Sequence, residues 1–318
     1  MKKLICILLG LGLLLLLPGG CAREQTPDSA DTTGKINIVS TIFAPYDFAR
    51  EIAGDYAAIS MLVPPGTESH SYEPSPQDII KVQNCDIFIH IGGESDAWVR
   101  EILQSVDTGD VEIVTLLDCA DAVQEEFVDG MQRDEHDHGD DPASYDEHIW
   151  TSPKNAMRIV QKLTNVLCQA DGAHAAVYQD NAAAYLVQLE KLDTCFAEIV
   201  DTGVRKTIVF GDRFPFRYFT DAYGLDYFAA FPGCAAETEA SAATVAFLID
   251  KINQEKIPVV FHVELSSKRM AQVISDATGA HVQLFHACHN VTHDELAGGA
   301  TYLSLMYANA DNLRAALS

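Results

Sequence analysis

The sequence predicts an α/β protein of two lobes, each a parallel sheet flanked by helices, with one long rigid helix joining the lobes. Short apolar runs without polar alternation recur along the chain, which is typical of strands buried on both faces. Helical segments separate these runs, as the crossovers between parallel strands require. The alternation of strands and helices is interrupted once, at residues 175–200. This stretch contains neither glycine nor proline, so it predicts the joining helix.

The N-terminal half carries four of the apolar runs, and three helices are predicted around them. The strands are Ile36–Ser40, Ile59–Val63, Cys85–Ile91 and Val111–Leu117. The helices are Pro76–Gln83, Glu94–Leu103 and one that begins at Ser152-Pro153. Ser75 is a suitable N-cap for the first of these helices, and proline is favourable at its first position because no hydrogen-bonding amide is lost there.

The stretch Ala175–Val200 predicts one helix of about 26 residues, roughly 39 Å long. Because it sustains no heptad, we interpret it as a rigid connector rather than a coiled-coil arm. Beyond it, strands are predicted at Thr207–Phe210, Ile257–Val263 and His281–Phe285, and helices at Thr244–Asn253, Ser267–Ala277 and Tyr302–Ala316. The expected division is an N-terminal lobe at 35–172, a linker helix at 173–202 and a C-terminal lobe at 203–318.

The first 20 residues resemble an export signal. Two lysines precede an apolar run over 4–17, which is too short to cross a bilayer and is followed by Pro18-Gly-Gly-Cys21. This predicts a lipid on Cys21 and a flexible polar tether over 21–34. Pro18 stands where a lipoprotein signal usually has leucine, so ordinary secretion is the alternative. The chain is expected outside the cytoplasm, membrane-anchored or periplasmic.

The charge balance excludes one class of partner. The chain has 46 acidic and 21 basic residues, a net charge of −25, which becomes −27 once Lys2 and Lys3 leave with the signal. Nucleic acid is excluded because phosphate binding needs clustered basic residues. A negative field attracts cations, although it serves solubility equally well.

Six cysteines remain after the signal and Cys21 are set aside. In an exported protein an even count permits disulfides, and we expect Cys234 to pair with Cys288 and Cys85 with Cys119. No two cysteines form a CxxC pair, which excludes a zinc ribbon.

Polar side chains beyond the predicted strands suggest a metal site. His70, Glu264 and His286 each follow a strand, and His148 precedes a helix. Ligands of open parallel sheets bind beyond the carboxyl ends of the strands, so these four side chains should converge between the lobes. Imidazoles with one carboxylate suit Zn²⁺, whereas Mn²⁺ tolerates the same donors but prefers more oxygen.

Other histidines have competing interpretations. His289 or His293 could ligate in place of His286. His90 lies inside an apolar strand and is expected in the core, and a core role is also favoured for His262. The tract Asp134–Asp141, with His136 and His138, could collect divalent cations near the site, or it is simply a solvated acidic loop.

Several motifs together carry a family resemblance. They are the segments 65–76 (PGTESHSYEPSP), 89–94 (IHIGGE) with Trp98, 146–153 (DEHIWTSP), 178–185 (YQDNAAAY) and 260–264 (VFHVE). The chain resembles, over Ile36 to Leu317, the zinc- and manganese-binding lipoproteins of bacterial ABC importers, zinc-uptake type.

The resemblance implies a buried metal site between two lobes and delivery of the metal to an ABC permease with its ATPase subunit. His70 and His148 match the family's first two histidine ligands. Glu264 matches a carboxylate ligand of manganese-type members, and His286 falls where many relatives carry a ligating aspartate.

The chain departs from the family pattern at one ligand. Relatives have a third histidine after the first strand of the second lobe, but here Gly211 takes that position and two residues are inserted. Asp212 could ligate instead, or Arg213 could pair with an acidic residue. We expect His286 to supply the missing imidazole, which favours zinc over manganese.

The expected function is therefore metal binding by a monomer without catalysis. The chain has no GxxxxGK[ST] phosphate loop, so ATP hydrolysis would belong to a partner subunit. The alternatives are a manganese-binding homologue, a surface adhesin and an exported zinc hydrolase. The hydrolase would need an open coordination position on the metal, and the chain has no HExxH motif.

Overall fold

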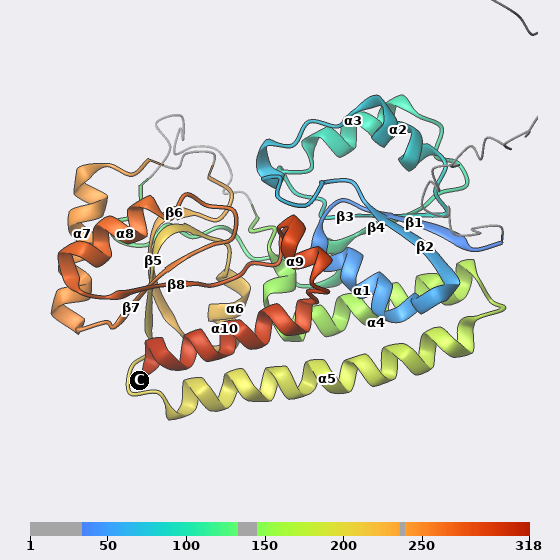
Figure 1. Ribbon diagram of the computed structural model, residues 1–318. Coiled ribbons are helices and arrows are strands. Elements are labelled where there is room, and N and C mark those ends of the chain that lie inside the picture. Colours follow the sequence, from blue (N-terminus) through green and yellow to red (C-terminus); the bar gives the residue numbers. More distant parts are fainter. Residues whose placement is uncertain (1–33, 133–144, 236–238) are drawn as a thin grey trace, which may run out of the picture. The chain divides into compact units, whose positions relative to one another are not determined.

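The computed structural model describes residues 34–132, 145–235 and 239–318, apart from the side chain of His70. Within these residues, two four-stranded parallel sheets are flanked by helices (Figure 1). The first sheet has the order β2-β1-β3-β4, and the second has the order β6-β5-β7-β8. The predicted α/β class with two parallel sheets is confirmed.

The elements have the following bounds. The strands are β1 (Ile36–Ser40), β2 (Ala57–Met61), β3 (Ile87–His90), β4 (Glu112–Thr115), β5 (Thr207–Phe214), β6 (Asp226–Pro232), β7 (Val259–His262) and β8 (His281–Leu284). The α-helices are α1 (Phe43–Ala53), α2 (Pro76–Gln83), α3 (Ala97–Ser105), α4 (Pro153–Ala170), α5 (Ala175–Thr202), α6 (Arg217–Tyr223), α7 (Ala242–Glu255), α8 (Arg269–Thr278), α9 (His293–Ala297) and α10 (Tyr302–Leu317). Short 3₁₀ turns are η1 (Gly54–Tyr56), η2 (Ser69–Ser71), η3 (Leu116–Cys119) and η4 (Ile149–Thr151).

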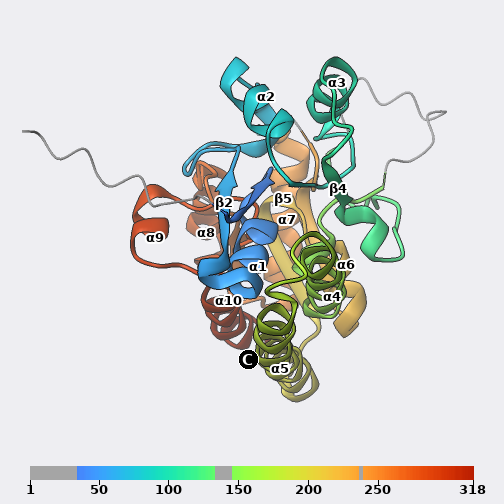
Figure 2. The same cartoon turned by 90° about the vertical axis from the view of Figure 1, so that its right-hand side faces the viewer.

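Each sheet buries both faces, as its continuous apolar strands require. Neighbouring residues of β1 point to opposite faces, so Ile38 joins the cluster with α1 and α4, whereas Val39 joins the cluster with α2 and α3. Figure 2 shows α2 and α3 on one side of the first sheet and α4 and α5 on the other. In the second sheet, Val209 packs toward α7 and α8, and Phe210 packs into the cluster shared with the first sheet.

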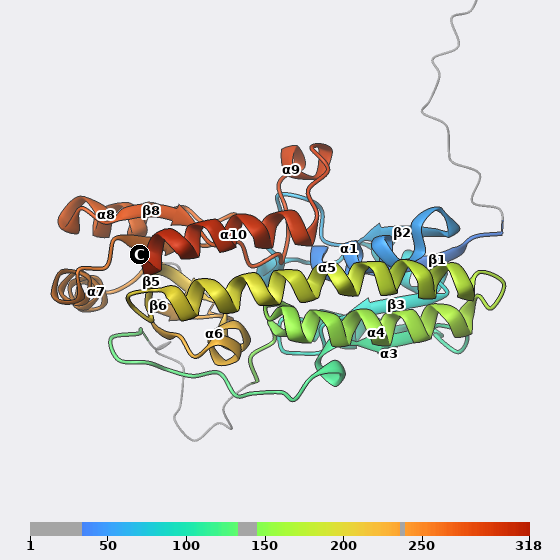
Figure 3. The same ribbon diagram turned by 90° about the horizontal axis from the view of Figure 1, so that it is seen from below.

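Helix α5 runs along both sheets and matches the predicted connector. It contacts α1 and α4 as well as α6 and α10 (Figure 3). Its fully buried side chains include Tyr178, Leu189 and Phe196, and Asn181 Nδ2 donates a hydrogen bond to the carbonyl of Ile52 at 3.0 Å. The lobe boundaries at 172 and 203 remain a prediction.

The chain passes from the first sheet to the second at another place besides α5, and the sequence did not predict this passage. Residues 123–132, which we call the strap, leave the first sheet and lie along β6 at the edge of the second. The Gln132 amide donates to the Ala230 carbonyl at 2.9 Å, and Arg217 forms an ion pair with Glu126 of the strap. The Cys234 amide donates to Glu125 Oε1 at 3.1 Å. The strap therefore covers the free edge of β6.

The expected disulfides are wrong, because all six described cysteines have free thiols. Cys85 packs between the first sheet and α2 and α3, whereas Cys119 packs against the cluster on the opposite face. The sheet itself therefore separates the first pair. Cys234 lies beside the strap, and Cys288 is buried in the turn after β8.

Four expectations lie outside the described residues. They are the export signal, the lipid site Cys21, the tether up to residue 33 and the tract at 134–141 with His136 and His138. In the parts of the chain that the structure describes, no helix combines the length and the apolar character needed to cross a bilayer.

Candidate metal-binding site

A small cavity, which we call the inner pocket, lies between the lobes at the carboxyl ends of β5 and β7. Its volume is about 30 Å³, close to that of one water molecule. The N-terminal lobe contributes Thr67, Glu68, Ser69 and His148 to its lining, and the C-terminal lobe contributes Arg213, Glu264, His289 and Asn290 among others. This is the position at which the sequence predicts a site.

His148 is fully buried immediately before η4 and is held by Asp146. Its backbone amide donates to Asp146 Oδ1 at 2.8 Å, and its Nδ1 lies 3.0 Å from the same oxygen. A carboxylate at Nδ1 makes that nitrogen the protonated one, which leaves Nε2 as the basic nitrogen that a metal requires. Burial lowers the pKa of His148, but the charges of Asp146, Glu147 and Glu125 more than compensate, so the pKa lies above its usual value.

Gly233 allows His148 to occupy this position. A Cβ at residue 233 would lie 3.0 Å from Cε1 and 3.2 Å from Nδ1 of the imidazole. These contacts are tighter than most Cβ atoms make, so a side chain at residue 233, directly after β6, would require the imidazole ring to shift by a few tenths of an ångström.

His289 brings a second imidazole to the same pocket from the turn between β8 and α9. Its ring centroid lies 5.1 Å from that of His148 and 5.0 Å from the Trp150 ring. Its backbone is held from both lobes, since its amide donates to Glu264 Oε1 at 3.0 Å and its carbonyl accepts from the Phe43 amide at 2.9 Å.

Glu264 lines the pocket directly after β7, as the sequence predicts for a strand-end residue. Its Oε2 accepts from the Ala287 amide at 2.7 Å, and its Oε1 accepts from the His289 amide. The carboxylate thus orders the turn that carries His289. Each carboxylate oxygen has further acceptor capacity, which remains available to a cation.

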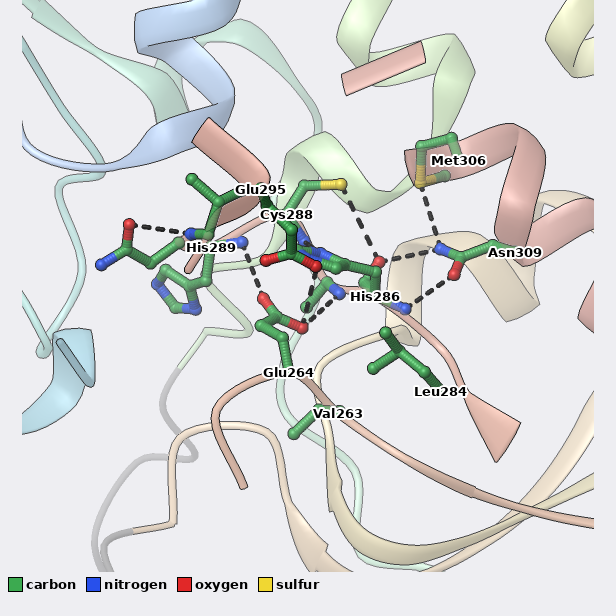
Figure 4. A network of polar contacts seen from close by, with 12 residues as sticks. Val263, Glu264, Leu284, His286, Cys288, His289, Glu295, Met306 and Asn309 are labelled. Atoms are coloured by element: carbon green, nitrogen blue, oxygen red, sulfur yellow. Dashed lines mark hydrogen bonds and ion pairs between the residues drawn. The ribbon is translucent and has the colours of Figure 1, made fainter. Parts of the chain in front are cut away.

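His286 lies on the other side of this turn and does not line the inner pocket (Figure 4). Its Nδ1 accepts a hydrogen bond from the Cys288 amide at 2.9 Å, and its Nε2 lies 4.0 Å from Glu295 Oε1. Asn309 holds its backbone by accepting from the amide at 2.7 Å and donating to the carbonyl at 2.8 Å. Through these contacts, His286 stabilises the conformation of the turn between β8 and α9.

Strand β5 carries Gly211, Asp212 and Arg213 in the stretch where the sequence resemblance predicts a ligand. A Cβ at Gly211 would lie 2.7 Å from Ala271 Cα, so this position accepts no side chain without movement of α8. Asp212 accepts from the backbone amides of Arg213 and Val263 at 2.8 and 3.1 Å. Arg213 enters the pocket and pairs with Glu68 of the N-terminal lobe at 2.8 Å, which is one of the two roles expected for this stretch.

His70 belongs to η2, next to the pocket-lining Ser69, but its side chain is outside the described part of the structure. Among the described side chains, no three potential ligands are grouped closely enough to hold an ion. The ligand set predicted from the sequence therefore stays a prediction.

The two histidines expected in the core are buried. His90 Nδ1 lies 3.2 Å from Asp96 Oδ2 and its Nε2 lies 3.1 Å from Thr115 Oγ1, so both ring nitrogens have partners. His262 Nδ1 lies 2.8 Å from the carbonyl of Val263.

Two residues that hold the segments lining the inner pocket had little or no signal in the sequence. Asp146 was visible only as the first residue of the 146–153 motif, two positions before His148. Asn290 had no signal at all, yet its Nδ2 donates to the carbonyls of Pro64 and Thr67 at 2.7 and 2.8 Å, across the lobes.

Comparison with known proteins gives a consistent relationship. Residues 38–316 match the family model described as ZnuA, zinc-uptake complex component A, periplasmic. The zinc-binding lipoprotein AdcA of Streptococcus pneumoniae strain R6 is 30% identical over 99% of this chain and 61% of AdcA, so the chain spans about three fifths of that relative. The high-affinity zinc uptake system protein ZnuA of Bacillus subtilis is 27% identical over 95% of this chain and 94% of its own length.

The solved structures agree with these relatives. The crystal structure of the Zn(II)-bound ZnuA-like domain of Streptococcus pneumoniae AdcA superposes with a TM-score of 0.72 at 28% identity, covering 89% of this chain and 99% of that domain. Because the family model spans most of the residues that build both sheets and the inner pocket, the chain belongs to the family of component A of zinc-uptake complexes.

Proposed function

We propose that this protein captures a divalent metal, zinc above all, outside the cytoplasm and delivers it to an ABC permease. The observation that carries the proposal is the meeting of His148 and His289, from opposite lobes, at one small pocket. Buried imidazoles oriented by carboxylates are the donors that zinc prefers. Relatives named as zinc-binding and zinc-uptake proteins support the same cargo.

We propose His70, His148 and His289 as the imidazole ligands, with Glu264 as the carboxylate at the same pocket. His289 replaces His286 in this set, because the ring of His289 lies beside that of His148 and both residues line the inner pocket, whereas His286 does not. Three imidazoles with one carboxylate favour zinc over manganese, which prefers more oxygen ligands.

The remaining features of the proposal concern partners and location. The family description names a component of an uptake complex, which supports a permease and its ATPase subunit as partners. A relative named as a lipoprotein supports anchoring through a lipid on Cys21. We further propose that the protein acts as a monomer of two lobes and carries its metal without catalysing a reaction.

Native mass spectrometry with elemental analysis of protein purified without chelator tests this function. We expect one tightly bound zinc ion per chain, retained through dialysis and lost in the His148→Ala variant. A chain that retains no metal, or whose metal content is the same in His148→Ala, would overturn the proposal.

A further inference from the structure

A second cavity adjoins the inner pocket, and we call it the vestibule. Its volume is about 230 Å³, against about 30 Å³ for the inner pocket. Glu68, Arg213 and Leu265 line both cavities, so these three side chains form the wall between them. Whatever occupies the vestibule lies next to the proposed metal site.

The vestibule is basic in an acidic protein. Arg213, Lys268 and Arg269 line it, together with the acidic residues Glu68 and Asp212. Both carboxylates are already engaged, Glu68 by Arg213 and Asp212 by two backbone amides. Lys268 and Arg269 form no ion pair with any described residue, although the chain carries 46 acidic residues.

The local backbone adds to this positive character. Lys268 and Arg269 stand at the N-terminus of α8, whose first turn contains no acidic residue and whose N-cap makes no side-chain hydrogen bond. Cations at this end of a helix are unfavourable, because the helix dipole is positive there. Ser266 also lines the cavity, and its buried Oγ has no hydrogen-bond partner among the described residues. An anion bound in the vestibule would balance the charges of Lys268 and Arg269 and would give Ser266 Oγ a hydrogen-bond partner.

We infer that the vestibule binds the carboxylates of a small anionic chelator, so that zinc reaches the inner pocket from a polycarboxylate complex. The inference rests on the proposed function, because it concerns how the metal of that site arrives. A hydrated Zn²⁺ ion gains nothing from two unpaired cations, whereas a complex with net negative charge is attracted by them. The size of the vestibule suits a small organic acid.

The transfer is an exchange of ligands without any change of oxidation state. Bonds from zinc to the chelator's carboxylate oxygens break as bonds from zinc to the imidazole nitrogens form. The chelator keeps its electron pairs and leaves as the free polycarboxylate. Its negative charge is balanced in the vestibule by Lys268 and Arg269 until it departs.

Stopped-flow measurement of zinc uptake by the metal-free full chain tests the inference. Zinc is offered either as the hydrated ion or as its citrate complex, and the fluorescence of Trp150, whose ring lies 5.0 Å from that of His289, reports binding. In the wild type, uptake from citrate should saturate with the complex and should exceed the spontaneous loss of zinc from citrate. The double variant Lys268→Gln/Arg269→Gln should take zinc from citrate about tenfold more slowly, while uptake of the hydrated ion is unchanged or faster.

A matched control separates local charge from net charge. Arg158→Gln/Lys256→Gln removes the same two charges from α4 and from the C-terminal end of α7, away from the vestibule, and should leave both rates near the wild-type values. The inference is overturned if Lys268→Gln/Arg269→Gln takes zinc from citrate at the wild-type rate, or if it slows both forms of zinc equally. Wild-type protein that fails to bind even hydrated zinc would instead overturn the proposed function itself.

Discussion

The imidazole rings of His148 and His289 meet edge to face, with their centroids 5.1 Å apart and their planes at 89°. The contact joins the two lobes at one point, because His148 precedes η4 and His289 belongs to the turn between β8 and α9. Neighbouring hydrogen bonds fix the approach, since Trp150 Nε1 donates to the Ala287 carbonyl at 2.7 Å and the Phe43 amide donates to the His289 carbonyl at 2.9 Å. The protein scaffold thus brings together two donors from opposite lobes.

Substitution should distinguish His289 from His286 as a zinc ligand. We expect His289→Ala to weaken zinc binding by at least about 100-fold, since loss of a direct ligand should exceed the loss of an outer partner. His286→Gln should change affinity less than tenfold but lower the free energy of unfolding by about 1–3 kcal/mol, because the Cys288 amide loses its acceptor. Competition with a chelator of known affinity measures the first effect, and urea denaturation the second. Equal losses of affinity in the two variants would contradict the assignment.

Removing the carboxylate that orients His148 should weaken zinc binding without removing a ligand. Asp146→Asn leaves Nδ1 without its anionic partner, and we expect affinity to fall by about 10- to 100-fold. Asp96→Asn is the matched control. Asp96 holds the buried His90 in a similar pair, with 3.2 Å between Asp96 Oδ2 and His90 Nδ1, and neither residue lines the inner pocket. The control should lose stability and keep its zinc affinity, and a comparable loss of affinity in both variants would argue against the role of Asp146.

Zinc binding should weaken on acidification, beginning above the ordinary histidine range. Burial lowers the pKa of His148, but Asp146 and its acidic neighbours raise it above the usual 6.5. In the metal-free chain, the stabilisation from the charged pair is fully present below 6.5 and is lost as pH rises through the raised pKa. Zinc must displace this proton, so affinity should fall by up to about tenfold per pH unit below the raised pKa.

Affinity measured between pH 5.5 and 8.5 checks this dependence, and calorimetry in buffers of different ionisation enthalpy counts the released protons. In Asp146→Asn the decline should begin at a lower pH, because the largest charge that raises the pKa is gone. Affinity that does not change with pH over this range in the wild type would be incompatible with His148 as a ligand.

A histidine introduced at Gly211, the position at which the sequence resemblance predicts one, should not provide a ligand. A Cβ at residue 211 meets Ala271 Cα at 2.7 Å and its nitrogen at 2.9 Å, so Gly211→Ala should destabilise the protein by about 1–3 kcal/mol in urea denaturation. Gly211→His should cost at least as much and bring no gain in zinc affinity. Gly172→Ala, whose nearest contact is at 3.9 Å, should change stability by less than about 0.5 kcal/mol. Tighter zinc binding in a stable Gly211→His variant would refute this explanation.

Elements with strong local signals were predicted closely. The bounds of β1 and α2 match the prediction, because a β-branched apolar run and a capping box with proline are properties of a few adjacent residues. The strand β5 was predicted to end at Phe210 but continues to Phe214, and its register with β6 shifts between Phe210 and Arg213. The polar residues of this extension obscured it. The strand β6 was missed altogether, and it ends in Pro232, which an edge strand tolerates.

Composition, periodicity and motif spacing are read along the chain, and they were enough to predict an acidic α/β protein with two parallel sheets, one long helix and a set of candidate metal ligands. Which of the candidate ligands lie next to one another depends on how distant segments pack together, and this became visible only in three dimensions. His286 and His289 are three residues apart, and their direction depends on a turn in which Cys288 adopts a φ of 57° while Glu264 and Asn309 hold the backbone. Those holding groups come from the segment after β7 and from α10, so no local pattern could reveal that His289 lies beside His148 and lines the inner pocket whereas His286 does not.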